Sequence, residues 1–197
     1  MTNDAPPRIG DLLRSAATRA TPFIRDTADT ALGSPTPCAE YDVRALLNHL
    51  FHVVVNFQAL AAKGAVDFSH TPDRLAEADW RDRFAAETGQ LVEAWSAPGA
   101  EEGTSGAMGL PARTVGFMVL LDLTVHLWDL ARATGRSFEP DPAVVAELVG
   151  EVERMAPMAR EMSVFAEAVD LPDPGRATAF ERLLATTGRD PRAVREA

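Results

Sequence analysis

The stretch VRALLNHLFHVVVNFQALAA, residues 43–62, predicts a long helix with apolar side chains on most of its surface. Asp42 before it is a favourable N-cap residue, and Gly64 after it is typical of a helix end. A helix that is apolar on most sides has to be covered by other elements, so we predict that this one is central. It also carries two histidines, His49 and His52, among its apolar residues.

Helical spacing of apolar residues continues on both sides of this stretch, whereas the strict alternation typical of strands is absent. We therefore predict an all-α fold, a four-helix bundle with additional C-terminal helices. The length of 197 residues suits one domain, 1–197, with a core bundle over about 8–135 and a C-terminal helical extension over about 140–190. The other expected helices are Arg8 to Thr30, Asp73 to Ala97, Pro111 to Thr134, Pro142 to Val169 with a kink at Pro157, and Thr178 to Thr187.

The charge and the cysteine content exclude several classes of function. The formal net charge is −10 and the basic residues form no cluster, which argues against a nucleic-acid partner and against an anionic membrane surface. A single cysteine cannot form an internal disulfide, and the N-terminus lacks the pattern of a signal peptide. No apolar run reaches the roughly 18 residues of a membrane span. We expect a cytoplasmic protein.

The stretch DLTVHLWDLARATG, residues 122–135, follows the apolar run from Val115 and carries Asp122 and His126 four residues apart. At this spacing both side chains project from one face of a helix, about one turn apart. Bundles build metal sites from side chains on facing helices, and one histidine from residues 43–62 would complete a set of three ligands. The alternative is a structural Asp–His pair that relieves the cost of a buried carboxylate. His49 and His52 lie within about 60° of each other on their helix, so spacing alone does not choose between them.

Two motifs, TPCAEYDVRALLNHL (residues 36–50) and DLTVHLWDLARATG, resemble the DinB-like helical bundles of actinobacteria. The resemblance is greatest to the metal-binding group that includes the N-terminal domain of mycothiol-dependent maleylpyruvate isomerase. The ending RLLATTGRDP, residues 182–191, resembles that of shorter members of this group. The resemblance covers nearly the whole chain and implies a DinB-like four-helix bundle.

The resemblance also implies a divalent metal, commonly zinc, held by three side chains, which match His49, Asp122 and His126. It thereby selects His49 over His52. In the isomerase the acidic ligand is glutamate, which is one methylene longer than Asp122. Tyr41 stands where the family usually has tryptophan, which we interpret as a packing difference.

Three further residues near these motifs have more than one interpretation. Asp129 could accept a hydrogen bond from the second nitrogen of His126, or form a surface ion pair with Arg132 or Arg136. His52 is a candidate catalytic residue for proton transfer. Cys38 has no histidine or lysine beside it in the sequence, and we interpret it as a small packed residue.

The function that the resemblance implies is a metal-dependent enzyme that uses a low-molecular-weight thiol, mycothiol in this group, as co-substrate. It would act as an S-transferase or isomerase on a small electrophilic molecule. The alternative is a non-catalytic metal-binding bundle that acts as a sensor or interaction module. The apolar helices are also compatible with a homodimer.

Overall fold

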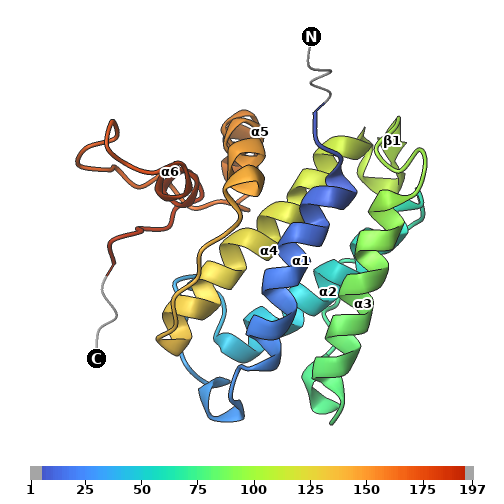
Figure 1. The fold of residues 1–197 in the computed structure, drawn as a ribbon, viewed down its shortest axis with the longest axis horizontal. Coiled ribbons are helices and arrows are strands. Elements are labelled where there is room, and N and C mark those ends of the chain that lie inside the picture. The colour runs from blue at the N-terminus through green and yellow to red at the C-terminus, as the bar shows by residue number, and fades with distance from the viewer. Residues whose placement is uncertain (1–5, 194–197) are drawn as a thin grey trace.

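The computed structural model describes residues 6–193 and is helical throughout most of its length (Figure 1). Within these residues the only sheet is an antiparallel pair of two-residue strands, with Thr104 opposite Pro111 and Ser105 opposite Leu110. The elements in chain order are α1 (Ile9–Arg25), η1 (Asp29–Ala31), α2 (Val43–Ala61), η2 (Arg74–Ala76), α3 (Trp80–Ser96), β1 (Thr104–Ser105), η3 (Gly106–Met108), β2 (Leu110–Pro111), α4 (Ala112–Thr134), α5 (Pro142–Glu161) and α6 (Ala179–Thr186).

Helices α1 to α4 form a four-helix bundle in which α1 contacts α3 and α4, and α2 contacts the same two helices. The predicted all-α bundle is therefore confirmed. Helix α2 is central as predicted, since most of its residues are buried, and the Asp42 side chain accepts a hydrogen bond from the Ala45 amide as its N-cap. Because α2 lies directly against α4, the histidines of one helix can reach the carboxylate and histidine of the other.

Helix α4 has the length and composition of a membrane span, with a mean hydropathy of 1.4 over its most apolar window. This corrects the expectation that no segment meets these criteria. The window is 83% buried inside the bundle, as expected for the core helix of a helical protein. Its apolar character is accounted for by packing against α1, α2 and α5.

Three predicted helices are clearly longer than those in the structure. Helix α3 begins at Trp80 rather than Asp73, and Arg74–Ala76 before it forms the turn η2. Helix α1 ends at Arg25, and the rest of the predicted segment forms the turn η1. Helix α5 contains Pro157 but ends at Glu161, because Ser163 adopts a left-handed backbone with φ 58°. The β1–β2 pair was not predicted, because strands of two residues leave no alternation to recognise.

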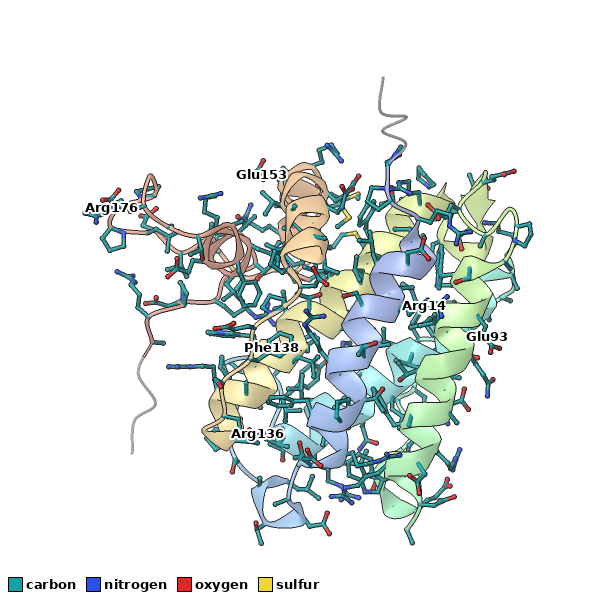
Figure 2. The ribbon with its side chains drawn as sticks, viewed as in Figure 1. Arg14, Glu93, Arg136, Phe138, Glu153 and Arg176 are labelled. Carbon is teal, nitrogen blue, oxygen red and sulfur yellow. The ribbon has the colours of Figure 1, made fainter. Side chains whose placement is uncertain are left out.

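The C-terminal extension packs against the bundle through the connection between α4 and α5, where Arg136 and Phe138 lie (Figure 2). The Phe138 ring contacts Phe23 of α1 and Phe180 of α6, with centroids 6.0 and 6.5 Å apart, in edge-on geometry. Arg136 stacks on Phe23 at 3.6 Å and donates a hydrogen bond to its carbonyl oxygen. These contacts fix α6 and the residues after it near the C-terminal half of α4.

Gly116 allows α4 to approach its neighbours closely. A Cβ at this position would lie 2.7 Å from the Ile9 side chain and 3.0 Å from the Trp95 ring, both buried. We expect Gly116→Ala to lower the free energy of unfolding by about 1–2 kcal/mol, since overpacking outweighs the gain in helix propensity. Gly89→Ala in α3 is the matched control, because nothing lies within 4 Å of its Cβ position. Urea unfolding should show opposite signs for the two variants, and a stabilised Gly116→Ala would contradict the packing described here.

Candidate metal centre

The structure brings together the three side chains predicted as metal ligands. Asp122 and His126 lie one turn apart on α4, and His49 reaches them from α2. His49 Nε2 lies 4.0 Å from Asp122 Oδ2, and His126 Nε2 lies 3.8 Å from Asp122 Oδ1. One possible ligand atom from each residue lies within 4.8 Å of the other two. The convergence that the two motifs predicted is therefore present.

The second nitrogen of each histidine is already engaged, which directs both Nε2 atoms toward Asp122. His126 Nδ1 hydrogen-bonds to Asp129 Oδ2 at 2.9 Å. His49 Nδ1 lies 3.5 Å from the Tyr41 hydroxyl, and the Tyr41 ring stacks on the His49 ring with centroids 5.2 Å apart. Only a packing role was expected of Tyr41. In the structure its hydroxyl also lies within hydrogen-bonding distance of the His49 imidazole.

The buried His49 Nε2 has no hydrogen-bond partner among residues 6–193. Its 4.0 Å separation from Asp122 is too long for a hydrogen bond. It is close to the roughly 3.4 Å that separates two N or O ligands around a tetrahedral zinc ion. A buried polar atom without a partner is costly, and a cation between the three side chains would satisfy it. The donor set of two imidazoles and one carboxylate therefore fits a divalent metal.

The environment of His49 favours the neutral state that metal binding requires of an imidazole. Burial lowers the pKa of His49, and the carboxylate of Asp122 opposes this effect only in part. His49 is therefore neutral at neutral pH, with a lone pair available. His126 is buried, whereas the side chains of His49 and Asp122 are 24% and 28% exposed. Three protein ligands with this partial exposure leave room for a further ligand from solvent.

Asp129 had two interpretations, and the first of them is confirmed, because its carboxylate accepts a hydrogen bond from His126 Nδ1. The other interpretation, an ion pair with Arg132 or Arg136, is wrong, because the structure pairs Asp129 with Arg189 at 3.0 Å. Burial alone would raise the pKa of Asp129, but the hydrogen bond from His126 and the charge of Arg189 outweigh it, and the pKa is lowered. Asp129 is thus a fully buried anion behind His126.

Arg189 and the position of Cys38 were not foreseen from the sequence. The Cys38 thiol lies within 4.8 Å of ligand atoms of His126 and Asp129, so it borders the centre. Burial raises the pKa of this thiol, and Arg189 opposes the shift only in part. Cys38 is therefore a protonated, half-buried neighbour of the centre, and the one available signal was its place in the motif that also contains His49.

His52 lies apart from the three ligand candidates. Its ring hydrogen-bonds to the Asn56 amide and meets the Phe68 ring edge-on at 5.7 Å. In the part of the chain that the structure describes, no hydrogen bond joins His52 to His49, Asp122 or His126. Burial lowers its pKa, so it is a neutral base at neutral pH. Its role in proton transfer stays a prediction.

The fold and the site together define a four-helix bundle with a candidate three-ligand metal centre between α2 and α4. The family model described as the mycothiol maleylpyruvate isomerase N-terminal domain matches residues 13–131, and the chain belongs to this family. The match includes all three ligand candidates and Asp129. It ends before α5, α6 and Arg189.

Two curated relatives are uncharacterized proteins of Mycobacterium tuberculosis, from strains CDC 1551 / Oshkosh and ATCC 25618 / H37Rv. Each is 32% identical to this chain over 121 residues, which are 59% of this chain and 62% of the relative. The aligned region thus spans a little under two thirds of these relatives. No solved structure shows a significant match to the chain.

Proposed function

We propose that the protein is a metal-dependent enzyme that uses a low-molecular-weight thiol of the mycothiol type. It acts on a small electrophilic molecule as an S-transferase or isomerase. The observation that carries the proposal is the buried His49 Nε2 without a partner, which faces Asp122 together with His126 Nε2. Membership of the mycothiol maleylpyruvate isomerase N-terminal domain family supports the choice of thiol.

His49, Asp122 and His126 would hold the metal, with zinc favoured by the two imidazoles and one carboxylate. When bound, a divalent metal lowers the pKa of a thiol and so supplies a nucleophilic thiolate at neutral pH. Asp129 and Tyr41 orient the two histidines through their Nδ1 atoms. His52, which follows His49 by three residues on α2, is our candidate for proton transfer at its neutral imidazole.

We propose a cytoplasmic location, where a reduced thiol pool of this kind is maintained, and the single cysteine supports this proposal. We propose a small molecule as the partner, with neither nucleic acid nor membrane, because the net charge of −10 disfavours both surfaces. Homodimer formation is a further proposal that sedimentation would test directly.

A thiol-consumption assay tests the activity. We expect zinc-loaded protein to consume mycothiol with an alkyl halide, or to isomerise a cis-unsaturated dicarboxylate, faster than buffer with zinc alone. Asp122→Asn should bring the rate back to that of the control, because the site loses its carboxylate ligand. Asp190→Asn, at a carboxylate paired with Arg192 on the surface, should retain the rate. Stoichiometric metal without either reaction over a panel of electrophiles would favour the non-catalytic bundle.

A further inference from the structure

The C-terminal segment contributes a largely covered arginine, Arg189, to the centre. Arg189 lies 60 residues after Asp129, and its Nη2 and Nε donate to the two carboxylate oxygens at 3.0 and 3.4 Å. The same carboxylate accepts the hydrogen bond from His126 Nδ1 at 2.9 Å. A continuous contact therefore runs from Arg189 through Asp129 to a candidate metal ligand.

The backbone around Arg189 is built to hold it there. Helix α6 begins with a capping box between Thr178 and Glu181. It ends at Thr186, and Gly188 shortly after it has a φ of 85°, which lets the Arg189 amide return to the Leu184 carbonyl at 2.9 Å. A Cβ at Gly188 would lie 2.6 Å from the Ala166 side chain, so the turn is also closely packed. Arg189 Nη1 donates to the Thr187 carbonyl, which fixes the guanidinium further.

The charge balance explains why an arginine is needed. Asp129 has no exposed surface, and the Arg189 side chain is only 12% exposed. A buried carboxylate is costly unless a cation and hydrogen bonds compensate it. His126 supplies a hydrogen bond to this carboxylate, and Asp122 and the Cys38 thiol carry no positive charge. Among the described residues, Arg189 is the cation that pairs with Asp129.

We propose that Arg189 is a positioning residue of the metal centre, which holds Asp129 so that His126 presents Nε2 to the metal. This inference rests on the proposed metal centre. It adds Arg189, which lies outside the family match over residues 13–131. It makes the C-terminal extension a component of the site. A purely structural role for the ion pair is the alternative to be tested.

The test uses the full chain with Arg189→Met, which retains the apolar stem of the side chain while removing its charge and hydrogen-bond donors. Arg189→Lys restores the charge without the two-pronged geometry. Arg192→Ala is the matched control, because this arginine lies in the same segment but pairs with Asp190 at the surface. Circular dichroism establishes that each variant is folded before the two measurements below.

The first measurement is zinc affinity by competition with a chromophoric chelator. We expect Arg189→Met to weaken binding by about 10- to 100-fold, the usual effect of losing a group that orients a ligand, with partial recovery in Arg189→Lys. The second is the tautomer of His126 in metal-free protein, from long-range proton–nitrogen spectra of the four histidines. We expect the Nδ1–H form in the wild type and in Arg192→Ala, and its loss in Arg189→Met.

The two measurements separate failure of this inference from failure of the proposed function. A wild-type protein that binds no zinc would refute the metal centre, while the tautomer of His126 would still show whether Arg189 orients it. An unchanged tautomer in Arg189→Met would overturn the inference, whatever happens to the affinity. Loss of the tautomer with unchanged zinc affinity would overturn the role of Arg189 in metal binding.

Discussion

Replacing His126 with alanine is expected to reduce the divalent metal in the purified protein from nearly one ion per chain to background. His126 is the most buried of the three ligand candidates, and it alone is fixed by a hydrogen bond to a buried carboxylate. Its loss leaves one imidazole and one carboxylate, contributed by two different helices, which form a much weaker site. Elemental mass spectrometry on both proteins measures the difference directly.

The same variant should lose the thermal response to chelators. A ligand that binds only the folded state stabilises it by about 2.7 kcal/mol at a hundred times its dissociation constant. The wild-type melting temperature should therefore fall on addition of a chelator, whereas that of His126→Ala should not change. His70→Ala is the control, because His70 is exposed in the loop between α2 and α3. Equal metal content in wild type and His126→Ala, or none in either after reloading, would leave Asp122 and His126 as a structural pair.

The features of the bundle and of its site that were predicted from the residues are those that depend on spacing within a single helix. The apolar surface of residues 43–62 and the four-residue spacing of Asp122 and His126 each follow from helical periodicity. That α2 and α4 lie against each other could be inferred only from the family resemblance. Hydrophobic periodicity does not show which helices pack together. His49 and His52 lie three residues and about 60° apart on their helix. In the structure this rotation directs His49 to the candidate metal centre and His52 to Asn56 and Phe68.

The remaining parts of the site depend on long-range contacts. Arg189 meets Asp129 across 60 residues of sequence, through two helices and a turn whose packing no local pattern specifies. The arginines nearer in sequence looked equally suitable, yet Arg132 stacks on Trp128 and Arg136 on Phe23. Helix α5 was predicted too long for a related reason, since the left-handed Ser163 that ends it has no strong sequence signal. Chemistry encoded within one helix was therefore predictable from spacing, and the meeting of α2 with α4 from the family resemblance, whereas the contact of Arg189 with Asp129 was predictable from neither.

Asp129→Ala is expected to lower the free energy of unfolding of the metal-free protein by about 3–5 kcal/mol, as for other buried ion pairs that lose one partner. The substitution leaves the Arg189 guanidinium buried without its anion and His126 Nδ1 without its acceptor. Urea unfolding in the presence of a chelator measures this loss free of any contribution from metal. Asp190→Ala, which removes a surface pair with Arg192, should change the stability by less than about 1 kcal/mol.

A double variant decides whether the loss comes from the unpaired charge. In Asp129→Ala combined with Arg189→Met, no buried charge is left without a partner, so the double variant should be more stable than the sum of the two single losses implies. An interaction of roughly 0.5–3 kcal/mol is expected for groups in direct contact. Strictly additive losses would mean that the two side chains act independently. Replacing a buried ion pair with apolar side chains often leaves the stability of a protein unchanged. If the double variant regains stability but still binds metal weakly, the buried pair is required for the geometry of His126 rather than for folding.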